Sequence, residues 1–118
     1  MDMTTATQAG NLYRAIKEVA DATTPDLTLR QFLVLLRVAS KGGPMSQQEL
    51  VDSEDQYKST ISKIITFLAG KYMGTKREGM GLIDVDLDPN DLRARLVSLS
   101  KEGERLTART VKHLQPRG

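Results

Sequence analysis

The sequence contains no cysteine and only one histidine, His113. Without cysteine there is no disulfide framework, no thiol nucleophile and no thiolate metal site. The single histidine has no Asp or Glu at metal-ligand spacing and no serine placed to form a catalytic triad with it. A Gly-x-x-x-x-Gly-Lys-Ser/Thr phosphate loop is also missing. The sequence therefore predicts a protein that is not an enzyme and that uses no cofactor and no metal.

Long apolar runs are absent as well. The longest one has five residues, Phe32 to Leu36, whereas a membrane-spanning helix needs about 20. The first residues, Met-Asp-Met-Thr-Thr, lack the cationic and apolar regions of a signal peptide. A chain of 118 residues that is 39% apolar is long enough for one modest core. We expect one soluble, cytoplasmic domain over residues 1–118, with no membrane partner.

Two capping patterns mark the part of the chain around which the rest is organised. Ser46 is followed three residues later by Glu49, and Ser53 is followed in the same way by Gln56. Each pair has the residue types of a capping box, which satisfies free N–H groups where a helix begins. Two helix starts about seven residues apart predict a short helix, a tight turn and a longer helix. This arrangement is a helix-turn-helix.

The longer helix has two chemically different faces. At about 100° per residue, Tyr57, Ile61, Ile64 and Leu68 fall on one apolar face. The other face has two cations, three hydroxyls and no carboxylate: Lys58, Ser59, Ser62, Lys63 and Thr66. Ammonium groups bind phosphates or guanine edges, and hydroxyls bind phosphates or bases. The pattern favours a helix that lies in the major groove of DNA; the alternative is a solvated surface helix.

A β-hairpin follows this helix. Residues 82–87 alternate between apolar and polar, Asp88–Asp91 has turn chemistry, and residues 95–99 are apolar enough for a return strand. The net charge is only +2, so the placement of cations matters more than their number. Between helix and hairpin, Lys71, Lys76 and Arg77 lie among glycines. We expect a flexible basic loop there, with room for a short strand, that is either a phosphate contact or a solvated connector.

These elements together predict a mainly α fold with a β-hairpin wing, an α+β winged helix-turn-helix. Thr28 and Gln31 add a third capping box, Thr4 or Thr5 caps the first helix, and Ser100 caps the last. The expected helices lie at about 5–22, 28–41, 46–52, 54–69 and 100–115, and the wing hairpin at about 82–99. The carboxylates of Asp52, Glu54 and Asp55 are expected in the first turn of the longer helix.

From Leu29 to Leu106 the chain resembles the MarR family of winged-helix regulators. Three motifs carry the resemblance, and they lie at Leu29–Leu36, Ser59–Leu68 and Asp88–Gly103. The last motif keeps Asp88, Asp91, Arg93, Leu99, a hydroxyl at Ser100 and Gly103. Three features depart from the family. Leu92 replaces the first arginine of the wing, residues 70–81 are inserted, and the outer helices are short.

The resemblance implies a double-stranded-DNA-binding transcriptional regulator, expected to be a repressor. Arg93 would enter the minor groove at the wing tip, where the alternative is that it only pairs with Asp91 or Asp86. Lys76 and Arg77 would add phosphate contacts. Family members often bind small aromatic anions, but this chain has little material for such a pocket, so no small-molecule effector is expected.

Two alternatives concern partners. The Leu12/Ile16/Val19 and Leu106/Val111/Leu114 stripes predict a homodimer; alternatively, they pack on one another within one chain. The modest charge, the missing wing arginine and the carboxylates before the longer helix also suit a winged helix that binds another protein of the transcription machinery instead of DNA.

Overall fold

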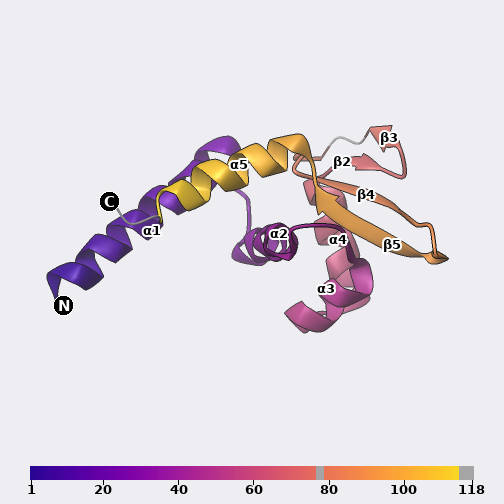
Figure 1. The fold of residues 1–118 in the computed structure, drawn as a ribbon, viewed down its shortest axis with the longest axis horizontal. Coiled ribbons are helices and arrows are strands. Elements are labelled where there is room, and N and C mark those ends of the chain that lie inside the picture. Colours follow the sequence, from indigo (N-terminus) through magenta and orange to yellow (C-terminus); the bar gives the residue numbers. More distant parts are fainter. Residues whose placement is uncertain (77–78, 115–118) are drawn as a thin grey trace. The chain divides into compact units, whose positions relative to one another are not determined.

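The computed structural model describes residues 1–76 and 79–114. The chain divides into two compact units (Figure 1). One consists of Met1–Leu27 with Arg105–Gly118, and the other is Thr28–Glu104. The single domain over residues 1–118 stays a prediction. No helix in the described part of the chain has the length and apolarity needed to cross a lipid bilayer.

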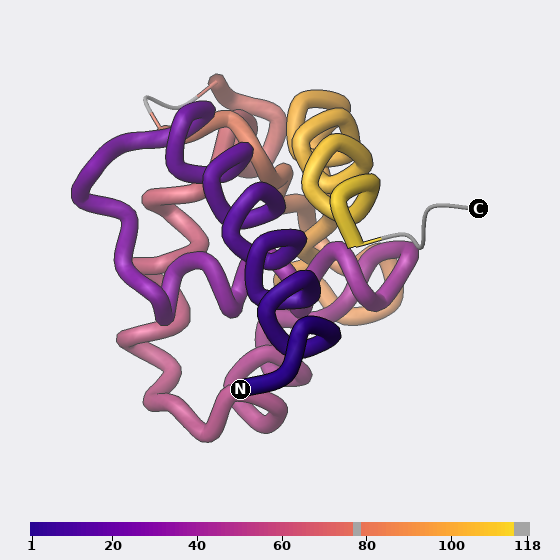
Figure 2. Tube along the Cα trace, turned by 90° about the vertical axis from the view of Figure 1, so that its left-hand side faces the viewer, coloured from indigo at the N-terminus to yellow at the C-terminus, as the bar shows by residue number. Residues whose placement is uncertain are grey.

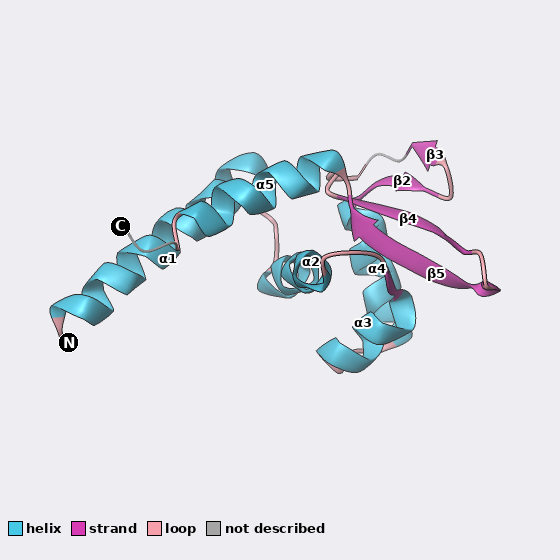
Figure 3. Cartoon of the chain, viewed as in Figure 1, coloured by secondary structure: helices cyan, strands magenta, loops and turns pink. Residues whose placement is uncertain are grey.

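The unit Thr28–Glu104 has the predicted winged helix-turn-helix fold. Its three complete helices are α2 (Leu29–Lys41), α3 (Gln47–Glu54) and α4 (Lys58–Leu68). Its strands are β1 (Met45–Ser46), β2 (Ala69–Tyr72), β3 (Thr75–Lys76), β4 (Ile83–Asp88) and β5 (Asp91–Leu99). They form one sheet in the order β1-β5-β4-β2-β3 (Figure 3). The fold class predicted from the sequence, mainly helical with a hairpin wing, is confirmed.

Two of the three expected capping boxes are present. Thr28 and Gln31 exchange both capping hydrogen bonds at the start of α2, and Ser46 and Glu49 do so at the start of α3. In each box the side-chain oxygen of the first residue accepts a backbone N–H, while the side chain of the second accepts the N–H of the first. Both helix starts were therefore decided by local chemistry.

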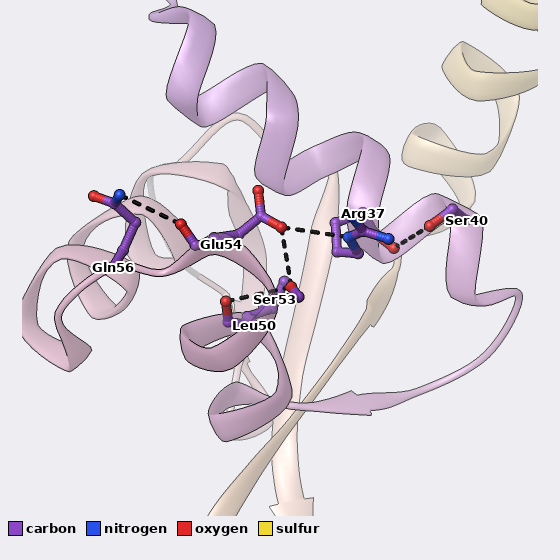
Figure 4. Close-up of polar contacts among 6 residues, drawn as sticks. All are labelled: Arg37, Ser40, Leu50, Ser53, Glu54 and Gln56. Atoms are coloured by element: carbon purple, nitrogen blue, oxygen red, sulfur yellow. Dashed lines mark hydrogen bonds and ion pairs between the residues drawn. The ribbon is translucent and has the colours of Figure 1, made fainter.

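The third box, Ser53 with Gln56, is wrong. Helix α3 continues through Ser53, whose Oγ donates to the Leu50 carbonyl and to Glu54 (Figure 4). The helix ends at Asp55, whose left-handed backbone (φ 50°) turns the chain. The Gln56 amide donates to the Glu54 and Asp55 carbonyls. Helix α4 thus begins at Lys58 instead of residue 54, without a side-chain cap.

The core of this unit lies between the helices and one face of the sheet. Its most deeply buried large side chains are Val34, Val38, Leu50, Ile61, Ile65, Leu68, Ile83, Val85 and Val97. Helix α2 buries Val34, Leu35 and Val38 but leaves Leu29 and Leu33 exposed. Helix α2 therefore contributes one face to the core and leaves the other open to solvent.

The segment expected to be a flexible basic loop forms a second small hairpin. Strand β2 follows α4 directly, pairs parallel with β4 and turns back into β3. The turn consists of Met73 and Gly74, both with positive φ. Met73 also donates its N–H to the Val85 carbonyl. The insertion thus extends the sheet of the wing by two strands.

Glycines in this region permit close backbone approach. A Cβ on Gly70 would lie 2.9 Å from the Gly81 Cα, and one on Gly79 would meet the Ala69 carbonyl oxygen. This proximity lets the N–H groups of Met80 and Leu82 donate to the carbonyls of Phe67 and Leu68. The end of α4 is therefore satisfied by a segment more than ten residues further along the chain.

The other unit contains α1 (Met3–Ala22) and most of α5 (Lys101–Lys112). Asp2 caps α1 through its carboxylate, so the expected caps Thr4 and Thr5 are wrong. The two helices lie side by side (Figures 1 and 2), and Glu18 forms an ion pair with Arg109 and a hydrogen bond with the His113 ring. Within this unit each predicted apolar stripe buries one member, Val19 in α1 and Leu106 in α5. The other members are exposed: Leu12, Ile16, Val111 and Leu114.

Candidate nucleic-acid interface

Helix α4 presents a cationic, hydroxyl-bearing face to solvent. Ile61, Ile64 and Ile65 are buried on its other side. Four of the predicted DNA-contacting side chains are exposed: Lys58, Ser59, Lys63 and Thr66. Thr66 donates its hydroxyl to the Ser62 carbonyl, which leaves its oxygen free to accept. The isoleucines therefore orient α4 so that its polar face remains accessible.

Tyr57 lies differently from its predicted place on the apolar face. It precedes the first residue of α4 and is 82% exposed. Because α4 begins at Lys58 and Tyr57 has an extended backbone, the helical periodicity does not apply to Tyr57. Ile65, which the face assignment omitted, fills the core position instead.

Ser62 is half-buried and connects the two helices of the motif. Its hydroxyl oxygen accepts a hydrogen bond from Nε2 of Gln47 at 3.1 Å. Gln47 lies at the first position of α3 and is buried. This bond fixes the start of α3 against the middle of α4. Ser62 and Lys58 line the same groove.

The wing tip is shaped by two aspartates. Oδ1 of Asp88 accepts the N–H of Asn90 at 2.9 Å, and Oδ1 of Asp91 accepts the backbone N–H of Arg93 at 3.0 Å. Asp91 therefore caps the turn backbone and does not hold the guanidinium. The Arg93 side chain is exposed and forms no ion pair within residues 1–76 and 79–114.

A groove of about 360 Å³ separates the helix-turn-helix from the wing. The helices contribute Gln48, Lys58 and Ser62 to its lining, and β5 contributes Arg93 and Arg95. Neither Gln48 nor Arg95 was predicted from the sequence to lie at this site. Arg95 was recognisable from the alternation of the strand, because residues two apart share a face. Gln48 carried no such signal.

The carboxylates that precede α4 do not lie in its first turn. Oε2 of Glu54 is 3.3 Å from Nε of Arg37 on α2, and the Glu54 side chain is only 8% exposed (Figure 4). Asp52 accepts a hydrogen bond from the Gln48 amide. Asp55 ends α3. The expectation of first-turn residues is wrong because α4 begins four residues later than predicted. The Glu54 carboxylate is thereby directed at α2.

Of the basic residues in the insertion, Lys71 and Lys76 are among the described residues and Arg77 is not. Lys76 is exposed in β3. In the register of the sheet it lies opposite Lys71 of β2, which in turn lies opposite Asp84 of β4. Paired residues share a face of the sheet, and Asp84 faces away from the buried Val85. Lys76 therefore lies on the opposite face from the groove. Arg77 lies outside the described residues.

The single histidine belongs to the helix pair. Nε2 of His113 is 2.9 Å from Oε1 of Glu18. Among the residues that the structure describes, no group of three or more His, Asp or Glu side chains is placed to hold a metal ion.

The chain is similar in sequence to curated transcriptional regulators of Escherichia coli. No family model matches the chain. Over 87 residues the chain is 31% identical to the transcriptional regulator HosA of Escherichia coli O111:H-. The match covers 74% of this chain but only 57% of HosA, so the chain spans little more than half the length of the curated relatives it matches.

Solved structures match along nearly the whole chain. A probable transcriptional regulator from Pseudomonas aeruginosa is 25% identical, with a TM-score of 0.60 over 96% of this chain and 77% of that one. A MarR variant from E. coli, solved with operator DNA, is 16% identical, with a TM-score of 0.63 over 94% of this chain and 67% of that one. The second match shows the fold alone. The predicted resemblance is confirmed: the chain is similar in sequence to transcriptional regulators and shares the winged helix-turn-helix fold of MarR.

Proposed function

We propose that this protein is a sequence-specific, double-stranded-DNA-binding transcriptional repressor of the cytoplasm. Helix α4 would lie in the major groove and the β4–β5 wing in the adjacent minor groove. The observation that carries the proposal is the exposed polar face of α4, which has two lysines and no carboxylate beside a wing whose tip exposes Arg93. Relatives named transcriptional regulators and a structural neighbour solved with operator DNA support it.

The proposed contacts follow from position. Lys58, Ser59, Lys63 and Thr66 would reach phosphates or base edges directly, and the half-buried Ser62 would do so only at the floor of the groove. Arg93 suits a narrow minor groove, where the negative potential is strongest. Lys76 and Arg77 would contact phosphates further along the duplex. Lys76 would do so from the other face of the sheet.

The protein would act as a homodimer. In the unit formed by α1 and α5, Leu12 is 51% exposed and Ile16 is 42% exposed, and Val111 and Leu114 are similarly uncovered. A second copy would bury these side chains at about 25 cal/mol per Å² of apolar surface. A two-fold dimer would place two α4 helices about 34 Å apart, one turn of DNA, on a palindromic site.

The test of DNA binding uses duplexes from the intergenic regions beside its own gene. Lys63→Ala and Arg93→Ala should each weaken binding by about 1–3 kcal/mol in fluorescence anisotropy, because each removes one cationic contact. Both side chains are exposed, so melting temperatures should not change. Lys17→Ala, which removes an exposed cation from α1, is the control. If both variants bind like the wild type, the site is assigned wrongly. Capture of a transcription protein with no DNA shift would favour the alternative of a protein-binding module.

The test of the dimer is sedimentation of the wild type and of Ile16→Asp. A charge at this exposed position should dissociate a dimer without affecting the fold of either unit. A wild type that sediments as a monomer at every concentration would contradict the dimer and leave the DNA-binding proposal standing.

A further inference from the structure

We propose that the groove between α3, α4 and β5 binds a phosphate of the DNA backbone and that Arg95 supplies one of its cations. This inference rests on the proposed function and adds to it a contact site that the resemblance did not supply. Leu92 replaces the first arginine of the family's wing. Arg95, further along the same strand, would supply the missing cation.

The register of the wing places Arg95 in the groove. Arg95 pairs with Leu87 and Val97 pairs with Val85. Val97 is fully buried against the helices, and residues two apart along a strand share a face. Arg95 therefore faces α3 and α4. The register shifts between Leu87 and Asp88, toward the tip, and Arg93 lines the same groove beyond this shift. Leu92 is exposed and is not part of the lining.

The groove is cationic and its charges are not neutralised. Lys58, Arg93 and Arg95 line it, and Asp91 is the only carboxylate in the lining. Asp91 uses Oδ1 on the Arg93 backbone. None of the three cations forms an ion pair within the described residues. Like charges held around one cavity repel one another, so a bound anion would relieve that repulsion.

Arg95 has hydrogen-bonding capacity to spare. Within residues 1–76 and 79–114, its guanidinium makes one hydrogen bond, a long one of 3.5 Å from Nη1 to the neighbouring Ala94 carbonyl. A guanidinium has five N–H donors in a planar fork that matches two phosphate oxygens. The volume of about 360 Å³ is ample for a phosphate group, since a water molecule occupies about 30 Å³ in the liquid. The Ser62 and Gln48 side chains add polar groups to the lining.

Because the groove lies between α4 and the wing, Arg95 would contact the DNA backbone and not the bases. In the proposed complex α4 occupies the major groove and the wing tip the minor groove, and a sugar-phosphate strand separates the two. Arg95 is two residues from Arg93, about 7 Å further from the tip at the usual rise of a strand. It would face the phosphates and not the base edges.

The experiment measures affinity between 50 and 200 mM salt on a bound intergenic duplex and on a scrambled duplex of equal length. Arg95→Gln should weaken both complexes by the same factor and flatten the slope of log K against log salt by about 0.9. Its deficit relative to wild type should therefore shrink about three- to fourfold over this range. Arg95→Lys should keep the wild-type slope. Lys101→Gln, with one charge removed beyond the other end of β5, is the matched control and should also keep it.

Other outcomes would overturn the inference. An Arg95→Gln slope equal to that of wild type would show that no phosphate contact was lost. A deficit confined to the intergenic duplex would indicate base contact instead. An equal loss of slope in Lys101→Gln would indicate a general effect of net charge. If the wild type binds neither duplex, the proposed function itself fails, and this result differs from all the others.

Discussion

Gly103 should be among the least replaceable residues in the chain. It lies buried in the first turn of α5 against the Leu82 backbone. A Cβ at this position would overlap the Leu82 carbonyl oxygen and would lie 3.0 Å from the carbonyl carbon and 3.2 Å from Cδ2 of Leu99. Two of these three neighbours are backbone atoms, so rotating a side chain does not relieve the overlap. Gly103→Ala must displace α5 from the strand segment.

The displacement would break hydrogen bonds between the start of α5 and the residues that precede β4. The Leu82 carbonyl accepts the Ser100 N–H at 3.0 Å, and the Ser100 hydroxyl donates to the Gly81 carbonyl at 2.6 Å while accepting the Gly103 N–H. Overpacking costs about 1–3 kcal/mol, and each lost hydrogen bond costs about 1 kcal/mol. The higher helix propensity of alanine returns at most about 1 kcal/mol. The net loss should be about 3 kcal/mol.

Calorimetry or circular dichroism would measure this loss. For a chain of this size, about 4 °C of melting temperature corresponds to 1 kcal/mol, so Gly103→Ala should melt about 12 °C below wild type. Gly43→Ala is the matched control, because its Cβ would meet nothing within 4 Å in the same unit. A melting temperature for Gly103→Ala within about 2 °C of the control would refute the close-approach argument.

Two further predictions concern ion pairs of the helix-turn-helix. Arg37→Met should lower the free energy of unfolding by about 2 kcal/mol, because the nearly buried Glu54 carboxylate loses its cation; an unchanged urea midpoint would contradict this. The Lys41 ammonium and the Ser46 N–H lower the pKa of Glu49, so the ionised carboxylate stabilises the folded state above the ordinary carboxyl range and stops doing so as pH falls through its folded-state pKa. Wild type should therefore melt above Glu49→Gln at pH 7, and the difference should shrink as pH falls below the ordinary carboxyl range; a constant difference as the pH is lowered would contradict the assignment.

Local chemistry made several features predictable. The Thr28 and Ser46 boxes began α2 and α3 as expected, since capping residues act within one turn of themselves. The wing turn lies at Pro89 and Asn90, where turn-forming residues interrupt the alternation of two strands. The polar face of α4 was likewise legible from its periodicity.

The end of α3 and the structure of the insertion could not be predicted from the sequence, because they depend on residues far away in the chain. Ser53 had the residue type of a cap, but Glu54 is held by Arg37 on another helix and α3 extends past Ser53. The glycines of residues 70–81 suggested flexibility. Their absent side chains instead let β2 and the end of α4 contact the segment before β4.

The sequence by itself determined where most helices begin, which side of α4 is polar and that a hairpin follows it, because each of these depends on residues within a few positions of one another. Only the tertiary structure decided where α3 ends, that the insertion becomes two strands and that Arg95 shares a groove with Lys58. These outcomes depend on pairing and packing between segments far apart in the chain, and one-dimensional patterns carry no information on such distances.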